Sequence, residues 1–250
     1  MNFHIAKGYK NLKNDLLEII SNINSYQNEF DTGKRNSIKK VEVSNKVIII
    51  KAFKIPNVIN QIVYRYFRKS KARRSFEYAT NLINLNIKTP SPIAYIEEFT
   101  LFGIKRSYYF SEFVDYDITY RELSLQSESE ENEVILRAFT KFTYGLHEKE
   151  VIFLDHSPGN TLIVKKNNGF DFYLVDLNRM KFGKLDFDER MKNFSRLTPE
   201  RDMIQLMSEE YAELSGENIE RVFKSMWYYT QKFQKKFQRK LRLKKKLLNK

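Results

Sequence analysis

Strand-like and helix-like segments are segregated along this sequence, and that separation limits the folds open to it. In the first half, short β-branched runs bounded by polar turns surround one basic helical stretch. From about residue 134 onward, apolar residues recur mainly at helical spacing, interrupted by one hairpin pattern. We therefore predict an α+β fold with a β-rich N-terminal lobe and an α-helical C-terminal lobe.

The first half reads as an antiparallel sheet with interposed helices. Leucine and isoleucine at helical spacing predict a helix from about Tyr9 to Ile23, and a second helical segment runs from Val58 to Leu85 with a break near Lys69-Ser70. The polar turn Ser44-Asn45-Lys46 separates two strand candidates. The strands that we expect in this half span residues 38–43, 47–53, 93–98 and 107–113.

The second half is predominantly helical around one hairpin. An acidic, serine-rich segment at 124–133 precedes a predicted helix at 134–147. Two short strands at 161–165 and 170–175 are joined by Lys166-Asn167-Asn168-Gly169, a strong hairpin turn. From about Pro199 the remaining chain is predicted to be helical.

The composition favours an anionic partner and is compatible with a reducing compartment. The 250 residues are 42% hydrophobic, which is enough for one core or for two lobes that share a cleft. The net charge is +13, and no Asp or Glu occurs from Lys224 to Lys250. The chain has no cysteine, no apolar run long enough to span a bilayer and no signal-peptide core at its start, so we expect a soluble or peripheral protein.

Two acidic motifs flank the predicted hairpin. An irregular stretch from Val151 to Asn160 places Asp155 and Asn160 on one loop between a helix and the hairpin. Asp176 follows the apolar strand that ends the hairpin. An acid that ends a buried strand is poorly placed for packing, and we expect it to bind a cation. The Asp155–Asn160 spacing alone is weak, because Asp and Asn are common turn formers.

A lysine on an apolar strand supplies a third element. Lys51 shares a face of its predicted strand with Val47 and Ile49, which could form the floor of an adenine pocket. A buried ammonium group needs an anion, and Glu77 on the following helix is the obvious partner. Two alternatives stay open: Lys51 extends to solvent at a strand edge, or Glu77 pairs with Arg73 or Arg74 on its own helix.

Together these residues match the requirements of phosphoryl transfer. That reaction uses a lysine on the phosphates, an acid that pairs with it and a carboxylate that accepts the hydroxyl proton. It also uses an amide and an acid that hold Mg²⁺. All five residue types occur here in that chain order.

The same segments resemble the protein-kinase-like superfamily, and more closely the lipopolysaccharide core kinases of the Kdo/WaaP family. The resemblance covers roughly Tyr9 to Asp202. Leu146-His147-Glu148-Lys149-Glu150-Val151, leading into Asp155–Asn160, resembles the approach to the catalytic loop. Residues 70–79 and 87–92 resemble the helix-C region and the strand after it, and Val175-Asp176-Leu177-Asn178-Arg179-Met180 resembles the metal-binding motif.

The resemblance implies a role for each matched residue. Asp155 is expected to be the catalytic base, Asn160 and Asp176 to hold Mg²⁺, and Lys51 to contact the α- and β-phosphates of ATP and pair with Glu77. The further nucleotide-binding residues that it implies are Ile49, the hinge residues Glu112, Phe113 and Val114, and the phosphate-covering turn Gly33, Lys34, Arg35 and Asn36. Asp202 is expected to be a buried acid that braces the catalytic loop.

Two departures from the protein-kinase pattern argue against a conventional, regulated protein kinase and are compatible with a sugar or small-molecule kinase. Phe153 stands where most kinases carry His, and Leu177 follows Asp176 in place of Phe-Gly. The resemblance implies an ATP:sugar phosphotransferase acting on Kdo or heptose of the lipid A-linked inner core. The expected domains are an N-lobe at 1–114, a C-lobe at 115–231 and a basic tail helix at 232–250.

The basic tail suggests an attachment to membranes. Phe233, Phe237 and Leu241 recur at helical spacing among Lys and Arg, as in an amphipathic helix on an anionic surface. We expect a cytoplasmic enzyme peripheral to the inner face of the inner membrane. A solvated, frayed end is the alternative.

Other readings of the chain stay open. His147 and His156 lack further ligands at zinc-site spacing, and the aromatic residues at 64, 66 and 67 beside Arg65 and Arg68 are better explained by helix packing than by base stacking. We expect no nucleic-acid partner. The functional alternatives are a kinase of another small molecule or of protein, and a pseudokinase that serves as a binding module.

Overall fold

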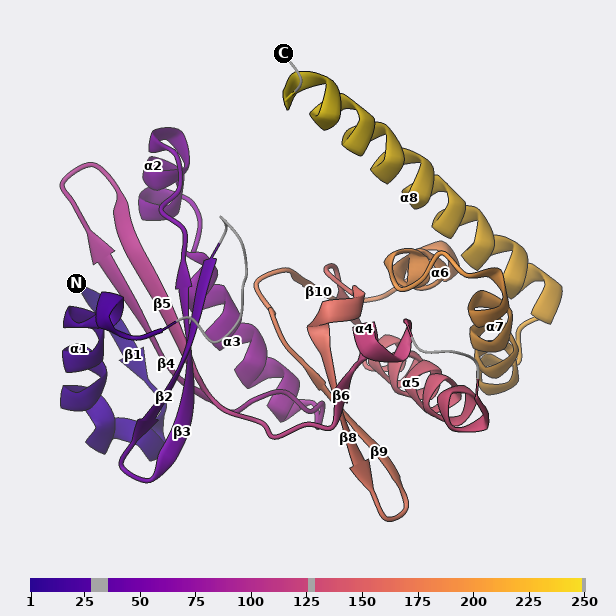
Figure 1. The fold of residues 1–250 in the computed structure, drawn as a ribbon, viewed down its shortest axis with the longest axis horizontal. Helices are drawn as coiled ribbons and strands as arrows, with labels where there is room; N and C mark the ends of the chain where they lie inside the picture. The colour runs from indigo at the N-terminus through magenta and orange to yellow at the C-terminus, as the bar shows by residue number, and fades with distance from the viewer. Residues whose placement is uncertain (28–35, 126–128, 249–250) are drawn as a thin grey trace. The chain divides into compact units, whose positions relative to one another are not determined.

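The computed structural model describes residues 1–27, 36–125 and 129–248. The chain forms two compact units, Met1–Asp115 with Asp176–Arg179 and Tyr116–Val175 with Met180–Lys250 (Figure 1). The first is rich in β-strands and the second in helices. The predicted α+β class is therefore confirmed.

The first unit is built on a five-stranded antiparallel sheet in the order β1-β4-β5-β3-β2. Its strands are β1 (Asn2–Ile5), β2 (Asn36–Val43), β3 (Lys46–Phe53), β4 (Pro92–Phe99) and β5 (Ile104–Glu112). Strand β1 was not predicted, because four residues carry little alternation. It pairs with β4 at one edge, where Asn2 donates a side-chain hydrogen bond to Glu97 at 3.0 Å.

Alternation along β3 decides which side chains face the core. Ile48 and Ile50 are fully buried and pack with Leu16 of α1 (Lys13–Ser21). Val47, Ile49 and Lys51 lie on the opposite face of the strand, as its period of two requires. The turn into β3 uses Ser44 and Asn45 at φ +48° and +61°, the left-handed pair typical of a tight hairpin.

Helices cover the sheet of the first unit. Short 3₁₀ segments, η1 (Lys7–Leu12) and η2 (Ile23–Ser25), flank α1. Helices α2 (Val58–Tyr66) and α3 (Lys71–Asn84) are separate, and the side chains of Asn57 and Ser70 cap their N-termini. The predicted break near Lys69-Ser70 is thus confirmed. Phe76 of α3 packs with residues of the sheet.

The second unit is a helical core with two small sheets. Its helices are α4 (Tyr120–Leu123), α5 (Glu130–Glu148), α6 (Phe187–Asn193), α7 (Arg201–Ser215) and α8 (Ile219–Leu248), with 3₁₀ segments η3 (Pro158–Asn160) and η4 (Phe194–Arg196). Its strands are β6 (Ile118–Thr119), β7 (Val151–Phe153), β8 (Thr161–Lys166), β9 (Gly169–Leu174) and β10 (Met180–Phe182). Phe139, Phe194 and Tyr211 are at the centre of the core. The predicted β8–β9 hairpin is confirmed.

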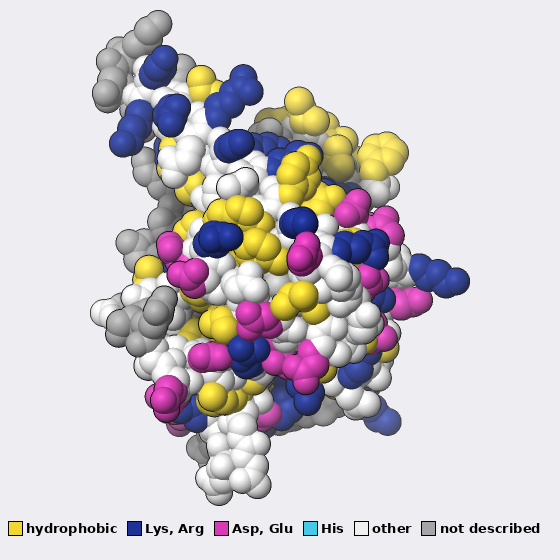
Figure 2. All heavy atoms as spheres, turned by 90° about the vertical axis from the view of Figure 1, so that its right-hand side faces the viewer, with side chains coloured by type: hydrophobic (Ala, Val, Ile, Leu, Met, Phe, Trp, Pro, Cys, Tyr) yellow, Lys and Arg dark blue, Asp and Glu magenta, His cyan; other side chains and the backbone are white. Residues whose placement is uncertain are grey.

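Helix α8 changes character along its length. Its first turns bury Val222, Met226 and Thr230, whereas most residues after Thr230 are exposed. The tail boundary expected at residue 232 therefore falls inside one continuous helix. Figure 2 shows Lys and Arg side chains along the exposed end. Among the helices that the structure describes, none combines the length and apolarity needed to traverse a bilayer.

Candidate active site

The loop after β7 is organised around the side chain of Asn160. Its Nδ2 donates to the backbone oxygen of Asp155 at 2.8 Å and to Ser157 Oγ at 3.1 Å. Its backbone oxygen accepts a bond from the amide of Val175 at 3.0 Å. The carboxamide oxygen of Asn160 accepts no hydrogen bond from the residues described. The loop is thus tied down while one oxygen donor is left available.

Arg196 of η4 orients the carboxylate of Asp155. Its Nη1 lies 2.7 Å from Asp155 Oδ1 and 3.2 Å from the backbone oxygen of Leu154. The Asp155 side chain is 19% exposed and that of Arg196 35%. This charge-assisted bond fixes the orientation of the Asp155 carboxylate. No spacing rule in the sequence indicated Arg196, because it lies far along the chain from Asp155.

A buried polar chain braces β7, the strand that leads into this loop. Tyr211 Oη lies 3.0 Å from His147 Nδ1, and His147 Nε2 lies 3.1 Å from Asn193 Oδ1. Asn193 Nδ2 then donates to the backbone oxygen of Phe153 at 2.8 Å. Since Asn193 Oδ1 can only accept, His147 carries its proton on Nε2. Burial lowers the pKa of His147 to about 4, so the neutral form is held.

This brace corrects the role expected for Asp202. Asp202 is exposed in the first turn of α7, where a carboxylate favours the positive end of the helix dipole. It is not a buried acid beneath the catalytic loop. His147 and Asn193, which are uncharged at neutral pH, support the loop without the desolvation cost of a buried carboxylate.

His156, next to Asp155, belongs to the core. It is 1% exposed and stacks on Phe139 with ring centroids 5.3 Å apart. Thr143 Oγ1 donates its proton to the Phe139 backbone and so accepts from His156 Nε2 at 3.3 Å. Burial lowers the pKa of His156 to about 3, and the positive charge of Arg196 acts in the same direction. A neutral, inward-facing imidazole is a structural residue.

In the first unit, Asp176 is held in an unusual conformation. Its φ is +60°, in the left-handed region that costs a non-glycine residue of order 1 kcal/mol or more. Asn178, itself 8% exposed, donates its side-chain amide to Asp176 Oδ1. Lys51 Nζ lies 2.6 Å from the same oxygen, and its side chain is only 12% exposed. The structure therefore brings Lys51 and Asp176 together.

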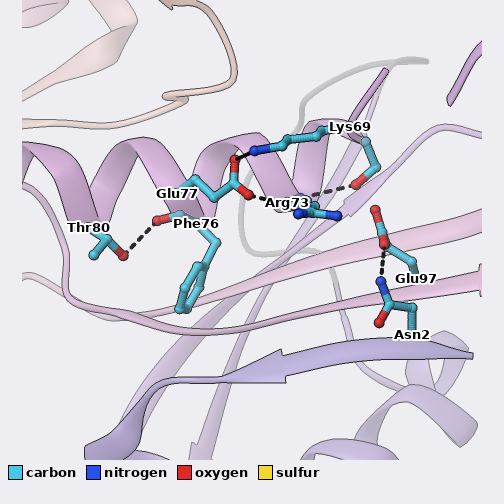
Figure 3. Close-up of polar contacts among 8 residues, drawn as sticks. Asn2, Lys69, Arg73, Phe76, Glu77, Thr80 and Glu97 are labelled. Carbon is cyan, nitrogen blue, oxygen red and sulfur yellow. Dashed lines mark hydrogen bonds and ion pairs between the residues drawn. The ribbon is translucent and has the colours of Figure 1, made fainter. Parts of the chain in front are cut away.

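The expected pairing of Lys51 with Glu77 is wrong. Glu77 accepts bonds from Lys69 at 2.8 Å and from Arg73 at 2.9 Å, and Figure 3 shows its carboxylate between them. Burial acts to raise the pKa of Glu77, but the hydrogen bonds from these two cations lower it below its ordinary value. Arg73 lies one turn before Glu77 on α3, so the local i,i+4 geometry satisfies the acid.

The predicted hinge follows β5 and offers one free backbone donor. The amide of Glu112 donates to Ser91 O and that of Phe113 to Val47 O, each at 2.9 Å. The amide of Val114 makes no hydrogen bond to the described parts of the chain. The Glu112 side chain is engaged by Lys46 at 2.9 Å. Of the three residues, Val114 is the one whose N–H is available to a ligand.

The phosphate-covering turn is described only at its end. Gly33, Lys34 and Arg35 lie outside the described residues. Asn36 opens β2 opposite Phe53, and its Oδ1 accepts from the backbone amide of Lys54 at 3.4 Å. Ile49 is half-buried on the same face of β3 as Lys51, as alternation predicts.

Comparison with solved structures identifies the architecture. A solved structure described as WaaP in complex with acyl carrier protein superposes with a TM-score of 0.64, covering 94% of this chain and 99% of that one at 14% sequence identity. The fold is protein-kinase-like. No protein-family model matches the sequence, and a search of curated proteins finds no match.

The candidate residues fall into two groups, one in each unit. Lys51 and Asp176 are positioned within the first unit, and Asp155 and Asn160 within the second. The Val175–Asp176 peptide bond joins the units at that point. At 14% identity the comparison establishes the fold and leaves the reaction to be argued from the residues.

The oxygen donors present are suited to Mg²⁺. In the second unit, Asn160 has a carboxamide oxygen that accepts no hydrogen bond from the described residues. In the first unit, Asp176 has a carboxylate. Each is a hard oxygen ligand of the kind that Mg²⁺ prefers. Magnesium in nucleotide sites takes few protein ligands, since phosphates and water complete its shell. Accordingly, a cluster of three His, Cys, Asp or Glu side chains is not required, and none occurs among the described residues.

Proposed function

We propose that this protein is a Mg²⁺-dependent kinase that transfers the γ-phosphoryl group of ATP to a sugar hydroxyl, Kdo or heptose, of the lipopolysaccharide inner core. The observation that carries the proposal is the arrangement around Asn160. On a protein-kinase-like fold, its Nδ2 donates a hydrogen bond to the backbone oxygen of Asp155, and its own side-chain oxygen accepts no bond within the described part of the chain. That is the state expected of a metal ligand next to a catalytic base.

Each residue has a role that its contacts support. Asp155 accepts the proton of the attacking hydroxyl while Arg196 holds its carboxylate. Lys51 binds phosphate oxygens, and Val114 donates its free amide to the adenine edge. Asn160 and Asp176 would hold Mg²⁺, which neutralises charge on the β- and γ-phosphates when bound.

The alignment of Lys51 does not depend on Glu77 in this proposal. The carboxylate of Asp176 forms an ion pair with the ammonium group of Lys51. The side chain of Asn178 stabilises the left-handed backbone conformation of Asp176. The ammonium group is consequently pre-positioned beside a metal-binding acid. Fixed positions of this kind matter most for a reaction whose catalysis depends on orientation and charge.

The sugar acceptor and the location rest on further features of the sequence. Leu177 after Asp176 departs from the motif of regulated protein kinases, which favours a small-molecule acceptor. The exposed half of α8 carries only basic charge, with Phe233 and Phe237 stacked at 6.1 Å. We propose that this helix holds the enzyme at the cytoplasmic face of the inner membrane, where a lipid A-linked acceptor would be found.

The reaction is tested first without assuming the acceptor. Purified chain is assayed for Mg²⁺-dependent ATP turnover, and Asp155→Asn is expected to lower kcat by about 100- to 10,000-fold. Asp171→Asn, a half-buried acid on β9 of the same unit, is the matched control and should retain activity. Equal turnover in the wild type and Asp155→Asn would support a pseudokinase.

The acceptor is identified by mass. Lipid A-core species are compared between cells with and without the gene, complemented with wild type or Asp155→Asn. Loss of one phosphate that only the wild type restores is the expected result. ATP turnover in vitro with an unchanged core profile would instead point to another small molecule or to protein as the acceptor.

A further inference from the structure

Helix α2 in the first unit is hydrophobic but buries none of its residues. A helix with apolar residues on one side normally packs that side against a core. Here Val58, Ile59 and Ile62 are between 41% and 74% exposed, and Phe67, which follows the helix, is 83% exposed. Val63 is half-buried. The tip of the β4–β5 hairpin is similar, with Leu101 82% and Phe102 78% exposed. Of the aromatic residues expected to pack as part of a helix, Tyr66 and Phe67 therefore face solvent, whereas Tyr64 is half-buried.

The helix and the hairpin tip form one surface. A Cβ on Gly103 would lie 2.7 Å from Gln61 Cβ, so the glycine lets α2 rest directly on the hairpin. Arg65 Nη1 donates to the backbone oxygen of Thr100 at 2.7 Å, and its guanidinium lies 5.5 Å from the ring of Phe99. Figure 1 shows α2 and this tip at the same end of the sheet. We define the α2 surface as Val58, Ile59, Ile62, Phe67, Leu101 and Phe102.

Basic residues predominate around the α2 surface, and the one partly exposed acid near the hairpin tip, Glu98, lies opposite Arg106. No Asp or Glu occurs between Glu42 and Glu77. Lys54, Arg65 and Arg68 are exposed beside the apolar residues, and Lys105 follows the hairpin tip. An apolar patch bordered by cations is complementary to the surface of an anionic bilayer, where acyl chains lie beneath negatively charged headgroups.

We propose that the α2 surface inserts into the headgroup region of a bilayer that contains anionic lipid. The apolar side chains enter the boundary with the acyl chains, and the Lys and Arg residues stay at the level of the headgroups. Only Phe67 and Phe102 of the α2 surface have rings on which a nucleic-acid base could stack. The other four side chains are aliphatic, which favours hydrocarbon over a polynucleotide. The proposal is carried by the first unit alone and requires neither kinase chemistry nor helix α8.

Insertion can be measured by site-specific labelling, because the chain has no cysteine. A single cysteine is introduced as Phe102→Cys or Phe67→Cys and labelled with an environment-sensitive fluorophore. Val134→Cys is the matched control, since Val134 is 56% exposed on α5 of the other unit. Vesicles of phosphatidylcholine with phosphatidylglycerol should shift the emission of the first two labels to the blue and leave the third unchanged.

Three results would overturn the proposal. One is an absent shift at positions 67 and 102 when the protein co-sediments with the vesicles. Another is an equal shift with polyglutamate, which supplies charge without hydrocarbon. The third is a shift that rises with protein concentration in the absence of lipid, which would assign the α2 surface to a second copy of the chain.

The energetic contribution is tested in a full-length chain in which four basic residues of the tail are neutralised by Lys→Gln and Arg→Gln changes at positions 235, 236, 239 and 240. In that background, the triple variant Ile59→Ser, Phe67→Ser and Phe102→Ser should bind the anionic vesicles at least about tenfold more weakly. These side chains are exposed, so folding is retained. Val134→Ser should leave vesicle binding unchanged. An equal loss of binding in Val134→Ser and in the triple variant, or no loss in the triple variant, would contradict insertion of the α2 surface.

Discussion

Arg196 Nη1 lies 2.7 Å from Asp155 Oδ1, and the same guanidinium lies 5.6 Å from the ring centroid of Phe233 in helix α8. One side chain therefore contacts both the proposed catalytic base and the helix that carries the basic tail. Because all three residues belong to the second unit, these contacts are internal to it. Orientation of Asp155 thus depends on a residue that is remote from it in the chain.

Arg196 is expected to position Asp155 and not to bind ATP. Arg196→Met should lower kcat by about 10- to 100-fold, the value of a hydrogen bond to a charged group, with the KM for ATP unchanged. Arg196→Lys should restore part of kcat, since an ammonium group can make one of the bonds. Steady-state kinetics measure kcat and the KM for ATP separately. A rise in the KM for ATP as large as the fall in kcat would contradict a positioning role.

Helix α8 is expected to have two separable functions. Neutralising Lys235, Lys236, Arg239 and Lys240 should weaken binding to anionic vesicles by roughly fivefold per charge and leave turnover in solution intact. Phe233→Ala should instead lower kcat a few-fold through Arg196, consistent with about 0.5–1 kcal/mol for a cation–π contact. Vesicle flotation and ATP turnover measure the two effects.

Leu243→Ala is the control for Phe233→Ala, because it is exposed further along the same helix. Deleting the tail from residue 232 would combine both effects, since it also removes Phe233. A loss of turnover in the charge-neutralised chain would show that the two functions are not separate.

Lys51 is expected to be essential for turnover but of minor importance for stability. Lys51→Met keeps the apolar stem and removes the charge that contacts Asp176. We expect kcat to fall by about 100-fold or more, while the free energy of unfolding changes by about 1 kcal/mol or less. Lys54→Met, an exposed neighbour, is the control, and turnover and urea unfolding are the measurements.

Acid should destabilise the second unit through its two buried histidines. Burial lowers the pKa of His156 to about 3 and that of His147 to about 4, below the ordinary value of 6.5. The unfolded chain therefore binds protons first as the pH falls below about 6.5, which favours unfolding. Between about pH 6 and pH 4.5, each histidine should contribute a slope approaching 1.4 kcal/mol per pH unit.

The measurement is urea unfolding as a function of pH, comparing the wild type with His156→Leu. In the acid range, the free energy of unfolding of the variant should depend less steeply on pH, by the contribution of one histidine. Above pH 7 the free energies of the two proteins should change with pH in parallel. An unchanged slope below pH 6 would show that His156 is protonated in the folded chain.

Local patterns identified most of the elements and the residue types of the candidate site. β-Branched runs and polar turns located β2, β3 and the β8–β9 hairpin within a few residues, because alternation and turn preferences are properties of short segments. The short strands β1, β6, β7 and β10 were missed. Segments of two to four residues carry little periodicity, and their partners are distant in the chain.

What the sequence determined by itself is the set of chemical groups and the elements that carry them: a lysine on an apolar strand, an acid and an amide on one loop, and an acid after a strand. Only the tertiary structure decided the partners: Asp176 for Lys51, Arg196 for Asp155, and α3's own cations for Glu77. The same holds for α2, whose apolar face stays uncovered. Propensity acts over a few residues, whereas ion pairing and burial depend on which distant segments the packed core brings within reach.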